Sequence, residues 1–313
     1  MPNRCKSYFG GIKMEQFKSG FVSLIGRTNA GKSTLLNALI GENIAIVTSK
    51  PQTTRTAIKG IVNRTNSQII FMDTPGIHRA KTKFNQSMLT TAYHTIQDAD
   101  VILFIVDAGY AKISEDSQKI IEKLKEQNSP VILVLNKMDE VKKEQILHLM
   151  DLYRQAYPFA SIIPISAKKK KNLENLLEEI EKNLPNGQPY YDQDEYTDQT
   201  ERQLVEEVVR EKCLKLLNDE VPHGIYVKVE EMKLKKMKNG KDFYDIQLVI
   251  YCERNSHKGI IIGKNGSMLK KIASYAREKI EAMLGIKVNM RVWVKVSEDW
   301  KKKLNVDQMN QLS

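Results

Sequence analysis

The sequence predicts a doubly wound, mostly parallel α/β sheet followed by a smaller α+β domain. Short apolar runs alternate with longer amphipathic stretches through about the first 185 residues. This order is typical of a parallel sheet with helices on both faces. A stretch that contains prolines and glycine then interrupts the pattern, and the order of elements changes after it. The chain has 313 residues, about the length of two domains.

The expected elements of the first part follow the order β–α–β–β–α–β–α–β–α–β–α. The apolar runs that predict strands are residues 21–25, 68–72, 101–106, 131–135 and 161–165, with 57–63 as a weaker strand that would form a hairpin with 68–72. The amphipathic stretches that predict helices are residues 32–40, 84–97, 115–126, 143–156 and 173–183. In such a sheet, ligands bind beyond the carboxyl ends of the strands.

Residues 184–198 combine two prolines, one glycine and four acidic residues without apolar periodicity, which predicts a linker. The order α–β–β–α–α–β follows, from a helix at 201–217, strands at 224–233 and 243–252, two helical pieces within 256–285 and a strand at 287–296. The predicted domain limits are a tail at 1–17, a first domain at 18–184, a linker at 185–200, a second domain at 201–303 and a tail at 304–313. Met14 is an alternative start to Met1.

The charge of the chain is basic and concentrated toward its carboxyl end. The formal net charge is +11, and the last 115 residues hold 23 Lys and Arg against 16 Asp and Glu. A basic surface of this kind indicates a polyanionic partner, either nucleic acid or an anionic membrane, although a merely solvated basic face has the same composition.

Several classes of protein are excluded by composition. The longest apolar run has six residues, at 101–106, whereas a helix that spans a bilayer needs about 20. No secretory signal is visible at the amino terminus. Three cysteines without CxxC spacing indicate neither a disulfide framework nor a zinc site, so a cytoplasmic protein with reduced thiols is expected.

A glycine-rich octapeptide follows the first predicted strand and fits the pattern GxxxxGK[ST]. Its residues are Gly26, Arg27, Thr28, Asn29, Ala30, Gly31, Lys32 and Ser33. The glycines let successive backbone N–H groups and the next helix amino terminus face phosphates. Lys32 should reach the β- and γ-phosphates, and Ser33 should ligate Mg²⁺. A glycine loop before a surface helix is the structural alternative.

Asp73 follows the strand at 68–72 and begins the segment Asp73, Thr74, Pro75 and Gly76. A carboxylate at a strand end beside a phosphate-binding loop is placed to bind Mg²⁺, usually through a water. The Gly76 N–H would approach the γ-phosphate. Alone, the segment is an ordinary turn sequence.

Two further turns at strand ends predict recognition of a guanine base. The first holds Asn136, Lys137, Met138 and Asp139, and the second holds Ser166, Ala167 and Lys168. The Asp139 carboxylate can accept from the guanine N1–H and N2 amino group, which adenine does not offer as a pair. Asn136 would bond the acceptor edge of the base, the Lys137 stem would cover the ring, and the Ala167 N–H would donate to O6.

The second domain contains the segment Gly263, Lys264, Asn265 and Gly266 between apolar flanks. This fits the GxxG loop of KH domains, whose glycines let a nucleic-acid backbone approach while a neighbouring groove takes about four unpaired bases. The predicted RNA-binding residues are Lys258, Gly263, Lys264, Asn265, Gly266, Lys270 and Lys271. A KH-like protein-interaction module is the alternative, and Trp293 is interpreted as a packing residue.

The four strand-end motifs together, over residues 18–184, resemble the GTPases of the translation-factor class. With the GxxG segment and residues 189–191, 197–199 and 210–212, nearly the whole chain resembles the Era family of bacterial ribosome-assembly GTPases, within the TrmE-Era-EngA-like group. This resemblance implies a P-loop NTPase G domain and a carboxyl-terminal type II KH domain. Thr28 and Ala30 stand where the family usually has Pro and Val, and Asp192 stands where it often has Pro.

The resemblance also implies roles for single residues. Residues 49–56 match the first switch segment, in which Thr54, or else Thr53, would close over Mg²⁺ and the γ-phosphate. Ile77 stands where many GTPases have a glutamine that orients the attacking water. Families without that glutamine often have an asparagine at the position of Asn29 that helps to hold a K⁺ ion, so slow, K⁺-stimulated hydrolysis is expected. Asn29, Lys32 and Thr54 are the catalytic candidates, and Ser33, Thr54 and Asp73 the metal ligands.

The partners implied by the resemblance are GTP or GDP, Mg²⁺, and the 3′ end of 16S ribosomal RNA in the 30S subunit. A monomer is expected, with some association with the cytoplasmic face of the membrane. In this hypothesis GTP and Mg²⁺ draw Thr54 and Gly76 onto the γ-phosphate, which changes how the G domain meets the KH domain. Two rivals are an RNA-binding scaffold that holds nucleotide without hydrolysis and a membrane-recruited signalling GTPase.

Overall fold

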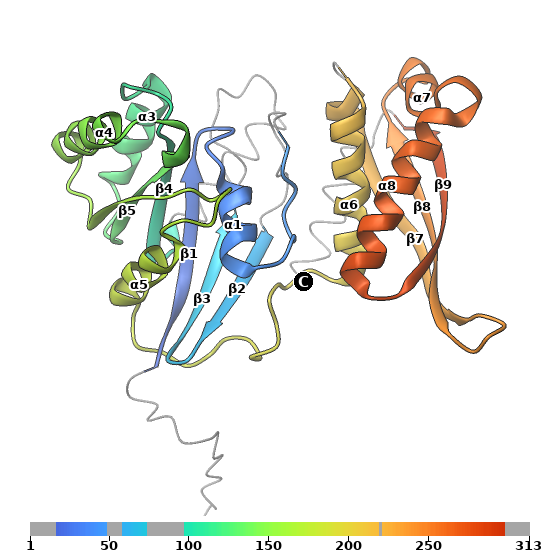
Figure 1. The fold of residues 1–313 in the computed structure, drawn as a ribbon, viewed down its shortest axis with the longest axis horizontal. Coiled ribbons are helices and arrows are strands. Elements are labelled where there is room, and N and C mark those ends of the chain that lie inside the picture. Colours follow the sequence, from blue (N-terminus) through green and yellow to red (C-terminus); the bar gives the residue numbers. More distant parts are fainter. Residues whose placement is uncertain (1–16, 49–57, 74–96, 219–220, 298–313) are drawn as a thin grey trace, which may run out of the picture. The chain divides into compact units, whose positions relative to one another are not determined.

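The computed structural model describes residues 17–48, 58–73, 97–218 and 221–297. The chain forms two compact units, the first made mainly of residues up to Asp198 and the second mainly of residues from Gln199 onward. Figure 1 labels the helices and strands of both units.

The first unit contains a six-stranded sheet in the order β2-β3-β1-β4-β5-β6. All neighbouring strands are parallel except β2 and β3, which form the expected antiparallel hairpin. The strands are β1 (Lys18–Gly26), β2 (Ile58–Arg64), β3 (Ser67–Asp73), β4 (Val101–Asp107), β5 (Val131–Asn136) and β6 (Ser161–Pro164). The mostly parallel, doubly wound sheet predicted from the sequence is therefore confirmed.

The helices of this unit are α1 (Lys32–Ile40), α3 (Glu115–Leu124), α4 (Lys143–Ala156) and α5 (Leu173–Asn183). Figure 1 shows α1 and α5 in front of the sheet. Apolar side chains of α3 and α4 pack on β4 and β5, where Phe104 meets Tyr153. β3 and β5 are buried along their whole lengths, as strands covered on both faces must be. The helix predicted at 84–97 lies outside the described residues except for its last residue.

The second unit contains a three-stranded sheet in the order β7-β8-β9, antiparallel between β7 and β8 and parallel between β8 and β9. Its elements are α6 (Glu201–Leu216), β7 (Ile225–Lys236), β8 (Asp242–Cys252), α7 (Asn255–Ile262), α8 (Ser267–Leu284) and β9 (Lys287–Val296). The predicted order α–β–β–α–α–β is confirmed. β7 begins one residue later and ends three residues later than predicted, because backbone pairing with β8 continues to Lys236.

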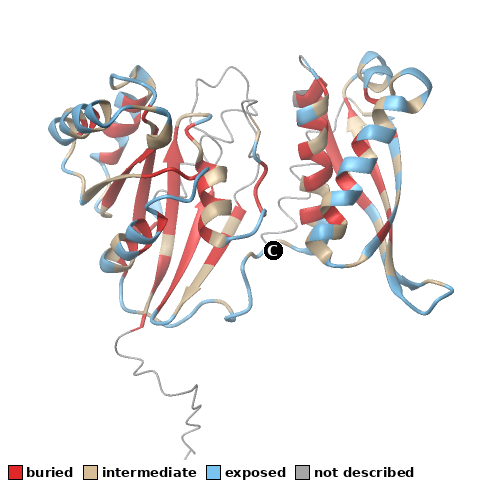
Figure 2. Cartoon of the chain, in the orientation of Figure 1, coloured by how far each residue is buried: buried red, intermediate tan, exposed pale blue. Residues whose placement is uncertain are grey.

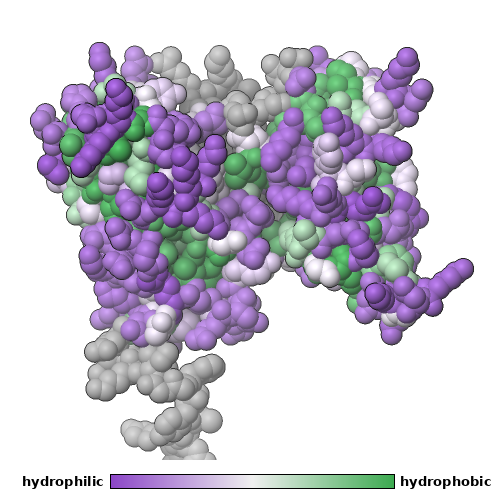
Figure 3. Space-filling view, in the orientation of Figure 1, coloured by the Kyte–Doolittle hydropathy of each residue, from purple (hydrophilic) through white to green (hydrophobic). Residues whose placement is uncertain are grey.

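The core of the second unit lies between its sheet and α6, α7 and α8. The buried strands of both sheets are red in Figure 2. The face of the molecule seen in Figure 3 is largely hydrophilic, in keeping with 28% charged residues. Among the described residues, none of the helices has the length and apolar character needed to cross a bilayer.

Residues 185–198, predicted as a linker, are bonded to the sheet of the first unit. Lys18 forms an antiparallel bridge with Asn186, and Gly60 forms one with Thr197. We call residues 185–198 the strap. Their attachment was not visible in the local sequence, because the partners lie more than 100 residues away in the chain.

Candidate functional site

The loop between β1 and α1 carries the predicted phosphate-binding residues, and its geometry requires glycine at two positions. Gly31 has a φ of 96°, and a Cβ there would lie 2.2 Å from Asn136 Nδ2. A Cβ at Gly26 would lie 2.3 Å from the backbone oxygen of Ile105 on β4. Asn29 is left-handed with a φ of 63°, a conformation that asparagine tolerates better than most residues. The tight curl that phosphate binding needs is thus built into the loop.

Lys32, the first residue of α1, folds back over this loop. Its Nζ donates to the backbone oxygens of Gly26 and Arg27, at 3.2 and 3.1 Å. Burial lowers the pKa of the Lys32 ammonium from its ordinary value, and the negative charge of Asp73 acts in the opposite direction. A buried ammonium is stabilised by an anionic partner, so the loop is suited to a phosphate.

Ser33 and Asp73 bring two oxygen ligands together from different elements. Ser33 Oγ on α1 donates to Asp73 Oδ2 at the end of β3, at 2.8 Å. The Asp73 carboxylate is fully buried. A hydroxyl and a carboxylate are hard oxygen donors, the kind that Mg²⁺ prefers. No group of three or more His, Cys, Asp or Glu residues suited to a metal occurs in the described ranges.

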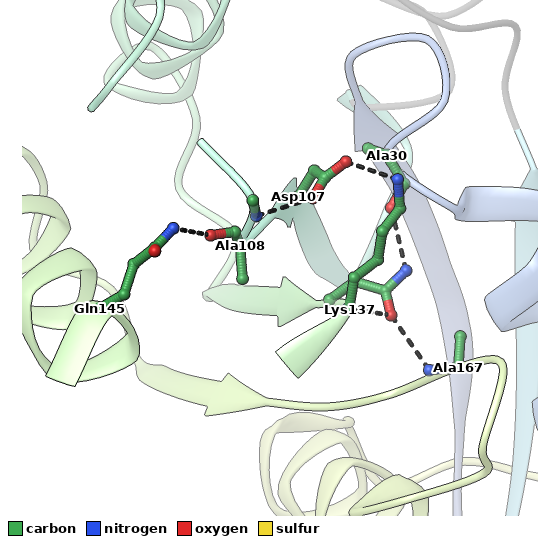
Figure 4. A network of polar contacts seen from close by, with 8 residues as sticks. Ala30, Asp107, Ala108, Lys137, Gln145 and Ala167 are labelled. Carbon is green, nitrogen blue, oxygen red and sulfur yellow. Dashed lines mark hydrogen bonds and ion pairs between the residues drawn. The ribbon is translucent and has the colours of Figure 1, made fainter. Parts of the chain in front are cut away.

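Asn136, the last residue of β5, joins three loops through its side-chain amide. Nδ2 donates to the backbone oxygen of Ala30 at 3.0 Å, while Oδ1 accepts from the N–H groups of Lys137 and Ala167, at 2.8 and 3.0 Å. Figure 4 shows this network. The Ala167 N–H, which was expected to donate to guanine O6, donates to Asn136 in the structure. Asn136 therefore holds the phosphate-binding loop and both predicted base-recognition turns in register.

Lys137 is held by a residue that the sequence interpretation missed. Lys137 is left-handed, with a φ of 65°, and its Nζ lies 2.5 Å from Asp107 Oδ2 at the end of β4. Asp107 Oδ1 accepts from the Gly109 N–H at 2.9 Å, and Gln145 on α4 donates to the next carbonyl, that of Ala108, at 2.6 Å (Figure 4). The only signal in the sequence is that Asp107 stands at a strand end.

Asp139 lies beside the second predicted base-recognition turn. A hydrogen bond from Ser166 and the charge of Lys169 Nζ, 3.2 Å from Asp139 Oδ2, lower the pKa of this carboxyl from its ordinary value, against the effect of desolvation. The group is therefore ionised at neutral pH, as acceptance of two N–H donors requires. The neighbouring residues Met138, Ser166 and Lys168 lie in the same pair of turns, where the Met138 N–H donates to the backbone oxygen of Ile165 at 3.0 Å.

The described part of the site is extended by the side chain of Arg27. Its guanidinium carbon lies 5.0 Å from the centre of the Tyr110 ring, and its Nε lies 3.4 Å from Asp116 Oδ2. Arg27, Thr28, Asn29 and Ala30 line one side of a pocket that continues to Tyr110. The remaining predicted residues, Thr53, Thr54, Thr74, Pro75, Gly76 and Ile77, lie outside the described residues.

The GxxG segment of the second unit lies between α7 and α8. Gly263, Asn265 and Gly266 all have positive φ, of 73°, 52° and 76°, and a Cβ at Gly263 would lie 2.8 Å from that of Met268. The loop therefore turns sharply, and its packing against Met268 leaves no room for a side chain at Gly263. Lys264 in the loop and Lys270 and Lys271 on α8 are exposed, and Lys258 on α7 is half-buried.

Two large aromatic side chains of this unit, Tyr275 and Trp293, are exposed. Tyr275 on α8 is 47% exposed, and Lys271 Nζ lies 6.0 Å from its ring centre. Trp293 on β9 is 43% exposed. Its neighbours on β9, Val292 and Val294, face the core, so Trp293 lies on the other face of the sheet, and its role as a packing residue stays a prediction.

Known proteins share both units. A family described as 50S ribosome-binding GTPase matches residues 21–137, and the KH domain family matches residues 220–301. GTPase Era of Clostridium kluyveri is 49% identical over 284 residues, which are 91% of this chain and 95% of that protein.

Two solved structures are similar over the same extent. One is Era in complex with MgGDPNP and nucleotides 1506–1542 of 16S ribosomal RNA, and the other is an Era variant of Aquifex aeolicus bound to GDP and AlF₄⁻. Each is 40% identical, has a TM-score of 0.85 and covers 91% of this chain and 95% of its own. On its motifs, its two folds and these similarities, the chain belongs to the Era family of GTPases.

Proposed function

We propose that this chain is a GTP-hydrolysing switch that binds the single-stranded 3′ region of 16S ribosomal RNA and acts in the assembly and maturation of the 30S subunit. The main support is the Asn136 amide, which ties the phosphate-binding loop to both turns that would read guanine. The similar Era complex with 16S ribosomal RNA supports the RNA part.

In this proposal the phosphates lie in the loop of residues 26–33. Backbone N–H groups and the amino terminus of α1 would face them, and Lys32 would exchange its carbonyl partners for the β- and γ-phosphates. Ser33 and Asp73, with Thr54, would hold Mg²⁺. When bound, Mg²⁺ neutralises negative charge on the phosphates.

Guanine would be selected by Asp139, whose carboxylate accepts from N1–H and the N2 amino group. The Lys137 stem would cover one face of the ring while its ammonium stays on Asp107. Thr74, Pro75, Gly76 and Ile77 would surround the γ-phosphate. Because Ile77 cannot orient water, we propose slow hydrolysis, with Asn29 helping to hold K⁺ against charge that develops between the phosphates.

The KH unit would take RNA across the backbone of Gly263 to Gly266, with Lys258, Lys264, Lys270 and Lys271 meeting phosphates. The proposed limits remain 18–184 for the G domain, 185–200 for the segment between the domains and 201–303 for the KH domain, with tails at 1–17 and 304–313. We also propose a cytoplasmic monomer that associates peripherally with the membrane.

The hydrolysis is tested by multiple-turnover phosphate release from GTP. Lys32→Ala should reduce release by about 100-fold or more, because it removes a cation from the developing charge. Lys123→Ala, an exposed lysine on α3, is the matched control and should hydrolyse GTP at the wild-type rate. Nucleotide binding without turnover by the wild-type chain would support the non-catalytic scaffold instead.

The RNA part is tested by titration with an RNA that has the 16S 3′ sequence. Gly263→Asp with Gly266→Asp should abolish binding. Lys264→Ala should weaken it several-fold, whereas Lys241→Ala, at the exposed turn between β7 and β8, should change it little. RNA binding by the double glycine variant with the wild-type affinity would contradict the proposed RNA site. The same holds if the wild-type chain binds anionic vesicles but shows no measurable affinity for the RNA.

A further inference from the structure

The strap begins with contacts to the start of β1. The Gly187 N–H donates to the backbone oxygen of Phe17 at 3.0 Å, and Ser19 Oγ donates to the backbone oxygen of Gln188 at 2.7 Å. A Cβ at Gly187 would lie 2.3 Å from Ser19 Oγ. The strap is therefore seated directly on the sheet at its first residues.

The middle of the strap is bonded to the buried side chain of Gln68 on β3. Gln68 Oε1 accepts from the N–H groups of Tyr190 and Tyr191, at 2.6 and 3.0 Å, and Nε2 donates to the backbone oxygen of Tyr191 at 2.8 Å. Gln68 is fully buried. Because a buried amide is costly unless it is hydrogen-bonded, these contacts make the strap part of the folded unit.

Asn63 stands opposite Gln68 on β2 and extends the same attachment. Its Oδ1 accepts from Gln68 Nε2 at 2.7 Å, and its Nδ2 donates to the backbone oxygens of Gln193 and Glu195, at 3.0 and 3.1 Å. One amide pair, from both strands of the hairpin, thus binds the strap backbone between Tyr190 and Glu195.

The last part of the strap runs along the outer edge of β2, which is the edge strand of the sheet. The Ile61 N–H donates to the backbone oxygen of Tyr196 at 2.9 Å, and Thr197 Oγ1 donates to that of Lys59 at 2.8 Å. Lys59 Nζ lies 3.5 Å from Asp198 Oδ2. The strap therefore runs antiparallel to β2 and ends beside its first residues.

This end of the hairpin is also the end that meets the nucleotide site. Ile58 is paired with Asp73, whose carboxylate bonds Ser33. The predicted first switch directly precedes β2, and the segment from Thr74 to Ile77 directly follows β3. Only three residues after Asp198, α6 of the second unit begins at Glu201, with a capping box formed by Thr200 and Gln203.

From this arrangement we infer that the strap couples the nucleotide state of the first unit to RNA affinity in the second, through its bonds to Asn63, Gln68 and Lys59. A flexible linker would absorb a shift of the β2–β3 hairpin, whereas a strap bonded to both strands moves with it and carries the start of α6. The inference rests on the proposed GTP switch. It names the residues through which that switch acts.

The experiment compares, in the full chain, the affinity for the 16S 3′ RNA with GDP and with a non-hydrolysable GTP analogue. Two matched pairs of variants are measured. Asn63→Ala removes bonds to the strap, whereas Asn66→Ala changes an exposed asparagine in the turn of the same hairpin. Asp198→Ala removes the partner of Lys59, whereas Asp194→Ala changes an exposed aspartate within the strap.

Asn63→Ala and Asp198→Ala should each bring the ratio of the two RNA affinities at least about threefold closer to one, since coupling energies of this kind correspond to factors of about 5 to 150. The affinity for GTP should not change, and the two control variants should keep the wild-type ratio. If the strap only stabilises the fold, Asn63→Ala and Asp198→Ala should lower the melting temperature but leave the ratio of the two RNA affinities unchanged. That result would overturn the inference.

The failure of this inference differs from failure of the proposed function. If the wild-type chain hydrolyses GTP and binds RNA with a state-dependent affinity that the strap variants do not alter, only the inference is wrong. If the wild-type affinities in the two states are equal, both the coupling and the switch are wrong.

Discussion

The side-chain amide of Asn136 connects β5 to the phosphate-binding loop, because its Nδ2 donates to the backbone oxygen of Ala30 at 3.0 Å. Asn136 is buried, and Gly31 leaves just enough space for it. The loop that would hold phosphate and the turn that would read the base are therefore positioned by one side chain. Removing the space beside it should disturb both.

Gly31→Ala and Gly41→Ala separate this crowding from backbone strain. Both glycines flank α1 with similar φ, 96° and 89°, but a Cβ at Gly41 would meet nothing within 4 Å. Gly41→Ala should cost about 1–2 kcal/mol of unfolding free energy from left-handed strain alone. Gly31→Ala should cost about 1–3 kcal/mol more, from the collision with Asn136, and should weaken GTP binding. Urea unfolding measures the loss of stability, and nucleotide titration measures the loss of GTP affinity. Equal losses of stability in Gly31→Ala and Gly41→Ala would contradict the predicted collision with Asn136.

The ion pair between Asp107 and Lys137 should be coupled in a double-mutant cycle. With Asp107→Ala, Lys137→Ala and the double variant, we expect an interaction free energy of about 1 kcal/mol in GTP binding. The exposed pair of Lys123 and Glu126 on α3 is the control and should show less than about 0.5 kcal/mol in stability. Additive effects of the Asp107 and Lys137 changes on GTP affinity would show that Asp107 does not position Lys137.

Asp139→Asn should exchange guanine for xanthine selectivity. Asparagine offers one acceptor and a donor, which no longer match the two N–H donors of guanine, so GTP affinity should fall by on the order of 100-fold while xanthosine triphosphate gains. Competition binding with both nucleotides measures this. Unchanged GTP affinity would contradict the assignment of Asp139 to the base.

Hydrolysis should depend on the monovalent cation. If Asn29 helps to hold K⁺, phosphate release should be several-fold faster in KCl than in NaCl at equal ionic strength, and Asn29→Ala should remove the difference without abolishing nucleotide binding. Equal rates of the wild-type chain in the two salts would reject the K⁺ site.

The second unit should lose stability in acid through Glu211. Desolvation acts to raise the pKa of this buried carboxyl, but hydrogen bonds and charge from Lys215 and Lys279 outweigh it, so the pKa is lowered from its usual 4.5. A group whose folded pKa is depressed stabilises the fold above its unfolded pKa. That stability should disappear as the pH falls below about 4.5 through the folded pKa.

Glu211→Gln should therefore destabilise the chain at pH 7 and flatten the dependence of unfolding free energy on pH in that acidic range. Glu278→Gln, an exposed glutamate on α8, is the control and should leave the profile close to that of the wild type. The measurement is chemical unfolding at a series of pH values, and parallel profiles for wild type and Glu211→Gln would refute the role of Glu211.

Local patterns were sufficient to predict most elements. The bounds of α1, α4 and α5 agree with the predicted helices. Amphipathic periodicity predicts α4 and α5, whereas α1 lies between Gly31 and Gly41, which are both left-handed. The strand-end motifs also predicted which residues would gather, since the carboxyl ends of parallel strands share one edge of a sheet. The proximity of Ser33 and Asp73 could be inferred in this way.

The sequence by itself thus determined the fold class, the order of elements and the pairing of Ser33 with Asp73, since each depends on short-range periodicity and on motifs at strand ends. Tertiary structure alone decided that Asp107 holds Lys137, that the Ala167 N–H bonds Asn136, and that the strap is seated on Asn63 and Gln68. These contacts join residues 30 to 132 positions apart. Which distant groups become neighbours depends on the order and register of the strands, which no local pattern encodes.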